Sequence, residues 1–169
     1  MHDELPDVRI TVVADGSGAY PDLPGMNAAI GTLWGHTRGT LGATPEWPEF
    51  ADVTAETQSL PGLFVKAGLH DPEITFARHD YAYDATQTFF GNLAGFDADE
   101  LLTLIDLNEA QIEAGGVTLF SYISPGDAHT VLGKPEFYTE ALNGLLLRDW
   151  VAALVAGTPV EDVHCTECN

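Results

Sequence analysis

Basic residues are scarce in this sequence of 169 residues, which has six lysines and arginines against 26 aspartates and glutamates. The formal net charge is therefore −20. Nucleic acids and anionic membrane surfaces bind positively charged patches, so this balance argues against both as partners. The surplus of acidic residues is most simply interpreted as a strongly solvated surface.

Long apolar runs are also missing. No stretch of about 18 consecutive apolar residues occurs, so we expect no membrane span. Residues 1–7 are acidic and lack the apolar segment of a signal peptide. Either the protein stays inside the cell, or its natural start lies upstream of Met1.

Cysteine is rare: Cys165 and Cys168 are the two in the chain, and both lie in the tail formed by residues 160–169. A single CxxC pair does not supply the four ligands of a structural zinc site, although His164 and Glu167 are further donors for a weak metal clip. A redox CxxC normally opens a helix after a strand, whereas this one lies in a tail. We therefore expect a disulfide, either local or to a cysteine outside the chain, and neither a metal site nor a cofactor.

What is present indicates one domain over residues 1–169, since the chain has the length of one domain and 45% of it is hydrophobic. Strand-like and helix-like segments alternate, which predicts an α/β fold with a parallel sheet. Strands are expected at residues 8–14, 73–78 and 117–123. Helices are expected at residues 24–34, from 61, from 85, at 98–114 and at 145–156.

Local signals mark the ends of these elements. Asp97 and Glu100 have the spacing of a capping box, and Gly115 and Gly116 are expected to end the same helix. Gly157 is expected to end the helix at residues 145–156. Residues 143–144, an Asn-Gly pair, predict a turn.

Each expected strand runs into a polar loop, at residues 15–18, 79–84 and 124–129. The carboxyl ends of parallel strands meet at one edge of a sheet, where such proteins place their sites. These three loops are therefore the candidate functional regions.

Asp84 and His129 are the candidate catalytic residues. A hydrolytic triad needs a histidine that takes a proton from the nucleophile and a carboxylate that orients the histidine. In α/β hydrolases the acid precedes the histidine in the chain, and Asp84 and His129 follow that order, each after a strand. We expect the two side chains to lie within hydrogen-bond reach.

Other interpretations of these residues stay open on spacing alone. Asp84 has the position of a helix cap, and His129 could simply bond to Asp127. The rivals of the candidate pair are the two acids Asp71 and Asp80 and the histidine His79.

A nucleophile is the missing part, because the chain contains no G-x-S-x-G elbow. The nearest approach is Ser17 within residues 15–18, where an aspartate replaces the first glycine. A plain turn is the simpler interpretation, and a hydrolase with Ser17 as a displaced nucleophile is the alternative. Ser59, Ser121 and Ser124 have no such context.

Four stretches together resemble the pectin acetylesterase family, which includes the Notum-like α/β hydrolases. Residues 12–20 are similar to a stretch that follows the family's nucleophile elbow, and residues 83–87 to its aromatic-Asp-x-x-Gln pattern. Residues 120–129 are similar to the strand and turn before the family's histidine, and residues 163–168 to its cysteine-bearing end.

This resemblance implies a three-layer α/β-hydrolase fold and a serine hydrolase that cleaves carboxylic esters. Asp84 would be the acid and His129 the general base, and no cofactor would be needed. The substrate would be an acyl ester, such as an acetylated polysaccharide. For the full-length protein, the resemblance implies an extracellular or cell-envelope location.

Placed on the family, Met1 falls in the helix after the nucleophile elbow. The chain would then be the carboxyl-terminal portion of the hydrolase, with the nucleophile and the oxyanion loop upstream. Such a portion would expose a sheet edge, from which we expect self-association. The alternative function is an inactive, hydrolase-like binding domain.

Overall fold

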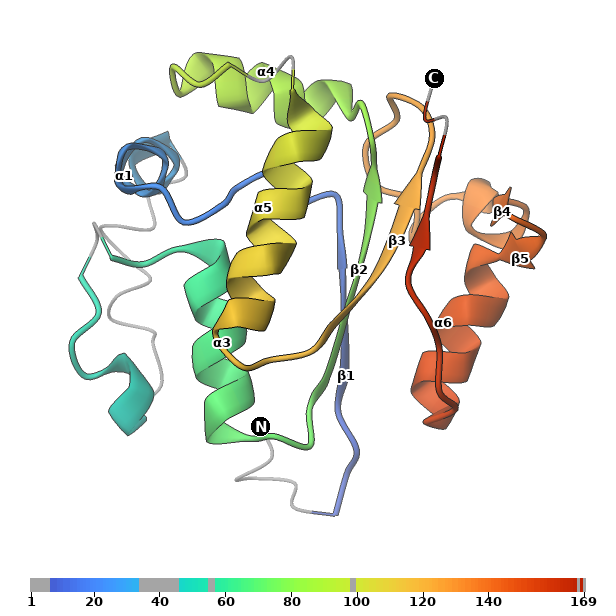
Figure 1. Ribbon diagram of the computed structural model, residues 1–169, viewed down its shortest axis with the longest axis horizontal. Coiled ribbons are helices and arrows are strands. Elements are labelled where there is room, and N and C mark those ends of the chain that lie inside the picture. The colour runs from blue at the N-terminus through green and yellow to red at the C-terminus, as the bar shows by residue number, and fades with distance from the viewer. Residues whose placement is uncertain (1–6, 34–45, 55–56, 98–99, 167, 169) are drawn as a thin grey trace.

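The computed structural model describes residues 7–33, 46–54, 57–97, 100–166 and 168, which form a parallel sheet with the strand order β1-β2-β3-β6 (Figure 1). Strand β1 (Thr11–Asp15) pairs with β2 (Thr75–Tyr81), and β2 pairs with β3 (Leu119–Ser124). The short strand β6 (Val163–His164) adds to the free side of β3. All three pairings are parallel, so the strands end at the same edge.

Helices cover both faces of this sheet. Helices α3 (Leu60–His70) and α5 (Leu101–Ala114) lie on one face, and α6 (Leu147–Ala156) lies on the other (Figure 1). This confirms the α/β class and is compatible with a three-layer arrangement. The remaining elements are α1 (Pro24–Leu33), α4 (Ala85–Leu93), two short 3-10 turns (Pro48–Phe50 and Pro135–Tyr138) and the hairpin of β4 (Ala141–Leu142) and β5 (Leu145–Leu146).

Two apolar interfaces hold the layers together. On the α6 face, Trp150 packs edge-on against Tyr122 of β3 with ring centroids 5.6 Å apart, and Leu147 and Leu154 fill the same cluster. On the α5 face, the buried cluster includes Ile105 and Ile123, and a neighbouring cluster includes Ile112 and Leu119. Burial of this apolar surface is the main stabilising term.

A buried charge joins β2 to α5. Arg78 of β2 is 2% exposed and donates to a carboxylate oxygen of Glu109 at 2.6 Å. Its other nitrogens donate to Ser121 of β3 and to Asn108 of α5. Because a buried charge is costly unless it is paired and hydrogen-bonded, this set of partners fixes how α5 sits on the sheet.

Several sequence-based boundaries need correction. The expected loop at residues 79–84 is wrong in its first half, because β2 continues through Tyr81 and buries residues 79–81. The hydrophobic pattern and the strand propensities of the sequence predict that a strand ends at the first run of polar residues. In β2, however, the polar side chains of residues 78–80 are buried and form hydrogen bonds inside the protein. Helix α5 begins at Leu101 with Glu100 at its N-cap position, and residues 98–99 lie outside the described residues. Residues 145–146, expected as the start of a helix, form β5 instead, and α6 begins at Leu147. Strands β4 and β6 had no sequence prediction.

Other local signals are confirmed. Asn143 and Gly144 both have positive φ and form the tight turn between β4 and β5. Gly115 ends α5, and Gly157 ends α6 with φ of 70°, a conformation that glycine adopts without strain.

The sheet edges are β1 and β6, and self-association through an edge stays a prediction. Within the described ranges, no helix combines the length and the apolar character that a bilayer crossing requires.

The contact of α3 with β2 and with the residues just before β3 predicts an unusual response to a glycine substitution. A Cβ atom on Gly68 would lie 2.6 Å from a methyl carbon of Val117 and 3.2 Å from the ring of Phe76. Alanine normally stabilises a helix interior by about 1 kcal/mol over glycine, but overpacking a core costs about 1–3 kcal/mol. We expect Gly68→Ala to lower the free energy of unfolding by about 1 kcal/mol in urea titrations.

The control is Gly25→Ala in α1, where the nearest atom to the new Cβ is 3.5 Å away on Phe96. This variant should be as stable as the wild type or slightly more stable. A Gly68→Ala protein that is more stable than the wild type would contradict the packing described here.

Candidate functional site

Asp84 and His129 meet at the carboxyl edge of the sheet. Asp84 follows β2 and His129 follows β3, and these strands are neighbours. The Oδ2 atom of Asp84 lies 2.7 Å from Nδ1 of His129. The Asp84 side chain is fully buried, whereas the side chain of His129 is 37% exposed. The expected contact between the two side chains is thus confirmed, and their catalytic role stays a prediction.

Asp84 is also the N-cap of α4, which confirms its interpretation as a helix cap and leaves its interpretation as a catalytic acid a prediction. Its Oδ1 atom accepts hydrogen bonds from the backbone N–H groups of Thr86 at 2.8 Å and Gln87 at 2.9 Å. The cap uses one oxygen and leaves the other for His129. Because a carboxylate can only accept, Nδ1 of His129 must donate, which leaves Nε2 of the neutral ring as an acceptor.

Gln87 fixes the buried carboxylate from the other side. Its Nε2 atom donates to Asp84 Oδ2 at 3.0 Å and to Asp80 Oδ1 at 2.9 Å. Its Oε1 atom accepts from the backbone N–H of Ala19 at 2.9 Å. Gln87 therefore ties Asp84 to the turn after β1. In the sequence, Gln87 belongs to the aromatic-Asp-x-x-Gln pattern at residues 83–87, but no role was predicted for it. Its position three residues after the helix cap Asp84 is the spacing of a capping box, which could have indicated a contact with the start of the helix.

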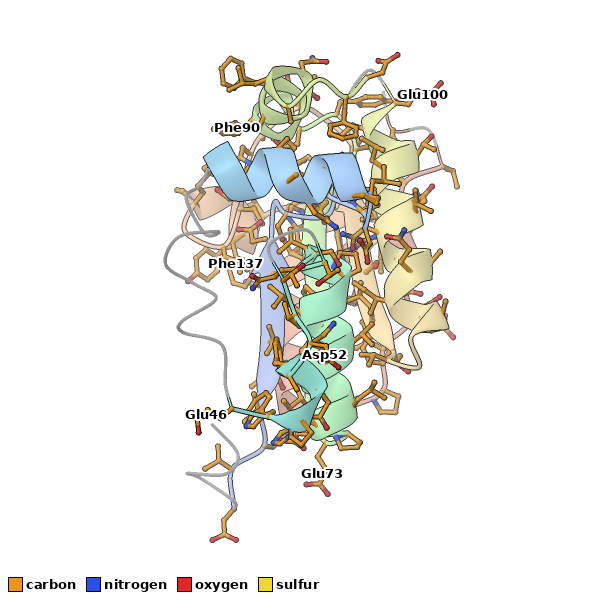
Figure 2. All side chains as sticks on the ribbon, turned by 90° about the vertical axis from the view of Figure 1, so that its left-hand side faces the viewer. Glu46, Asp52, Glu73, Phe90, Glu100 and Phe137 are labelled. Carbon is orange, nitrogen blue, oxygen red and sulfur yellow. A yellow bond between two sulfur atoms is a disulfide. The ribbon has the colours of Figure 1, made fainter. Side chains whose placement is uncertain are left out.

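A cavity of about 470 Å³ opens beside His129. Its walls come from the turn after β1, from α1, from the start of α3 and from α4. Figure 2 shows this side of the molecule, with α1 crossing in front of the strand ends, α4 above it and α3 below. Tyr20 lines the cavity, and burial together with the charges of Asp84 and Asp80 raises its pKa to about 12. Tyr20 is therefore a neutral phenol at physiological pH.

Ser17 lines the same cavity, one residue after Gly16. A Cβ atom on Gly16 would lie 3.0 Å from the ring of His129, so the turn and the ring are in close contact. Among the described residues, however, no hydroxyl bonds to Nε2 of His129. Ser59 also lines the cavity, but its hydroxyl accepts from Gly62 as the cap of α3.

The structure separates the rivals from the candidate pair. Asp71 lies at the end of α3, before β2 begins, and therefore at the opposite edge of the sheet. Asp80 and His79 lie within β2, and the side chains of both are fully buried. None of the three has the partly exposed position of His129.

His79 forms a second histidine–acid cluster inside the protein. Its Nδ1 atom lies 3.2 Å from Asp15, and its Nε2 atom lies 3.0 Å from the hydroxyl of Ser124 and 3.2 Å from Glu140. Tyr81 and Ser124 both donate to Glu140. The arrangement resembles a catalytic triad in its chemistry, but His79 and Ser124 are fully buried. We interpret it as a positioning cluster.

The His79 cluster positions the loop that carries His129. The carboxylate of Asp15 accepts from the backbone N–H groups of Val131 and Leu132, each at 2.8 Å. These residues lie two and three positions after His129, so Asp15 anchors the loop to β1. Neither the role of Asp15 nor the burial of His79 had been predicted, because both depend on contacts across more than 60 residues.

The charged side chains of the His79 cluster, which are His79, Asp15 and Glu140, shift one another's pKa values. Burial lowers the pKa of His79, but hydrogen bonds and charges from Asp15 and Glu140 outweigh burial and raise it above 6.5. Burial raises the pKa of Asp15 and of Glu140, but their bonds to His79 and to neighbouring donors lower both below the ordinary values. A protonated His79 between two carboxylates is thus favoured.

The pH dependence of stability follows from these directions. A raised pKa of His79 gives stability that is complete below about pH 6.5 and is lost as the pH rises through the folded-state value. The lowered pKa values of the two acids give stability above about pH 4.5 that is lost as the pH falls further. Melting temperatures should therefore be highest between these limits and should decline above pH 6.5.

We expect His79→Gln to weaken the decline in melting temperature between pH 6 and pH 9. The exposed His164 supplies the control, because His164→Gln should leave the wild-type decline in place. An undiminished decline in His79→Gln would show that another group causes it.

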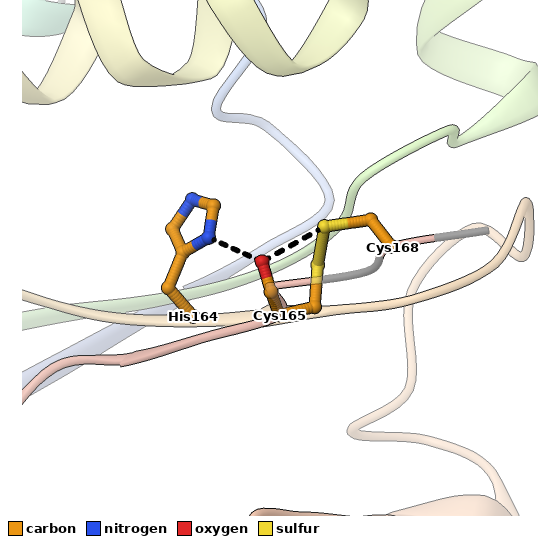
Figure 3. Close-up of side chains that lie close together, drawn as sticks. All are labelled: His164, Cys165 and Cys168. Atoms are coloured by element: carbon orange, nitrogen blue, oxygen red, sulfur yellow. Dashed lines mark hydrogen bonds between the residues drawn. A yellow bond between two sulfur atoms is a disulfide. The ribbon is translucent and has the colours of Figure 1, made fainter.

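The cysteine-bearing tail contains a local disulfide between Cys165 and Cys168, as one of the two sequence-based alternatives expected (Figure 3). His164 lies beside it, with Nδ1 3.0 Å from the carbonyl oxygen of Cys165. The imidazole and the two sulfur atoms lie close enough together to resemble a metal site. The sulfur atoms are bonded to each other, however, and thiolates are needed for ligation.

Comparisons with known protein families, with curated proteins and with solved structures found no match to this chain. The resemblance to pectin acetylesterases therefore stays an expectation from short motifs.

Proposed function

We propose that this chain supplies the acid and the general base of a carboxylic ester hydrolase with a serine mechanism. The observation that carries the proposal is the hydrogen bond of 2.7 Å between buried Asp84 and partly exposed His129 beside a cavity. A fixed carboxylate keeps the proton on Nδ1 and stabilises the imidazolium that forms when Nε2 takes a proton.

In the proposed reaction, a hydroxyl attacks the ester carbonyl while Nε2 of His129 accepts its proton. The imidazolium then protonates the departing alkoxide, which leaves an acyl-enzyme. Water then attacks the acyl carbonyl with His129 again as the base. The imidazolium returns this proton to the oxygen of the nucleophile as the bond between that oxygen and the acyl carbon breaks and the acid product leaves. Asp84 keeps its charge throughout and holds the ring in place.

The attacking hydroxyl has two candidate sources. The first is a serine outside these 169 residues, as the family resemblance implies, and the lack of a partner for Nε2 among the described residues supports it. The second is Ser17, which the cavity favours because it lines the same space as His129. An acetylated polysaccharide is the ester that the resemblance suggests.

The central variants are Asp84→Asn and His129→Ala, tested with 4-nitrophenyl esters on this chain and on any longer chain that its gene encodes. Asparagine can still cap α4, so Asp84→Asn should fold and yet lower kcat by about 10⁴-fold. His129→Ala should cause a loss of similar or larger size.

Asp127→Asn is the matched control, because Asp127 is an exposed acid on the loop of His129. It should keep wild-type activity. Loss of activity in Ser17→Ala would identify Ser17 as the nucleophile. Full activity of this variant in the longer chain, together with no hydrolysis by the 169-residue chain, would assign the nucleophile to residues outside these 169. Absence of hydrolysis by both chains would reject the esterase proposal in favour of a binding domain.

A further inference from the structure

The residue after His129 has a strained backbone. Thr130 has a φ of 58°, which lies in the left-handed region. Among the residues that the structure describes, Asn143 is the other non-glycine residue with a positive φ. Asparagine tolerates this region, whereas a β-branched threonine there is an outlier. Such strain persists only where the surrounding structure imposes it, and it is concentrated at functional sites.

The chain before Thr130 is fixed through His129. Nδ1 of His129 lies 2.7 Å from the buried carboxylate of Asp84. The carbonyl oxygen of His129 accepts from the ammonium group of Lys134 at 2.6 Å and from the hydroxyl of Thr130 at 2.7 Å. Both the ring and the backbone of His129 therefore have fixed partners.

The chain after Thr130 is fixed through Val131 and Leu132. The Val131 side chain is fully buried in the cluster that packs on α6. Oδ2 of Asp15 accepts from the N–H groups of both residues at 2.8 Å, and Oδ1 accepts from Val131 at 3.1 Å. Thr130 is thus a link of one residue between two fixed points. A single residue has two soft backbone dihedral angles with which to make such a link.

The turn after β1 lies directly against this link. A Cβ atom on Gly16 would lie 3.0 Å from two ring atoms of His129 and 3.0 Å from the γ-methyl carbon of Thr130. The residue that follows Asp15 in the chain therefore contacts the imidazole and the threonine together. The end of β1 thus acts on the His129 loop through hydrogen bonds and through packing.

We propose that Asp15 and Thr130 are positioning residues for His129. Asp15 holds Thr130 in the left-handed conformation, and this conformation directs the imidazole to Asp84. The consequence for catalysis rests on the proposed function. The orientation of the ring does not, because it can be measured in a protein without activity.

The test is a cycle of Asp15→Ala, Thr130→Gly and the double variant. Without Asp15, Thr130 should relax toward a negative φ and the ring should turn away from Asp84. Glycine adopts the left-handed conformation without strain, so a glycine at position 130 no longer needs Asp15 to impose it.

Nitrogen NMR of the neutral imidazole of His129 gives the ratio of the Nδ1–H form to the Nε2–H form, and the bond to Asp84 favours the first. We expect Asp15→Ala to lower this ratio about tenfold, which is the size of effect that a hydrogen bond to a charged group gives. Thr130→Gly should keep the ratio near the wild-type value, and the double variant should regain most of what Asp15→Ala loses.

Recovery in the double variant separates positioning from a merely structural contact. Glycine adds freedom to the unfolded chain, so it does not compensate for a general loss of stability. An unchanged ratio in Asp15→Ala would overturn the inference, and so would a loss that Thr130→Gly does not restore.

Stability gives a second measurement, which does not require Asp15→Ala to fold. The matched control is Thr139→Gly, because Thr139 has a φ of −121° and its hydroxyl also donates to a backbone carbonyl oxygen, that of Glu136. Both glycine variants lose a hydroxyl and gain freedom in the unfolded state, but strain is relieved at position 130. The urea midpoint of Thr130→Gly should therefore be the higher of the two. An equal or lower midpoint would overturn the inference.

Ester hydrolysis, measured on the same proteins, gives the catalytic readout. In Asp15→Ala, kcat should fall with the NMR ratio, by about tenfold, and it should recover in the double variant. A recovered ratio in proteins without hydrolytic activity would sustain the positioning role and reject the esterase proposal. The failure of one proposal is therefore distinguishable from the failure of the other.

Discussion

The arrangement of the whole site depends on the buried carboxylate of Asp84. One oxygen accepts two backbone N–H groups and starts α4, and the other accepts from Gln87 and lies 2.7 Å from His129. A buried carboxylate is tolerated only when its hydrogen-bonding capacity is met, so the helix, the amide and the imidazole are needed together. The carboxylate thereby couples the local fold to the orientation of a partly exposed histidine.

A second group of buried polar residues holds the other half of the site. Asp15 binds His79 in the neighbouring strand and the backbone that follows His129, so β1 fixes the loop from which His129 extends. The cost of burying these charges is offset within the cluster, because the histidine lies between two carboxylates. The edge of the sheet is thus held rigid on both sides of the cavity, as a preorganised site requires.

Local signals explain what could be predicted from the sequence. The cap at Asp84, the Asn-Gly turn and the glycine that ends α6 depend on neighbouring residues, and each is found as expected. The meeting of Asp84 and His129 followed from a topological rule about parallel strands. Burial of His79, the anchoring role of Asp15 and the cavity beside His129 depend on residues distant in the chain, and polarity alone wrongly predicted a loop at residues 79–81.

The protonation state of His129 tests the central claim most directly. Nitrogen NMR of the imidazole, assigned by comparison with His129→Ala, distinguishes a proton on Nδ1 from a proton on Nε2 in the neutral ring. The account predicts a proton on Nδ1, and its loss as the dominant form in Asp84→Asn. A neutral ring with its proton on Nε2 in the wild-type protein would contradict the account, because no base would then face the cavity.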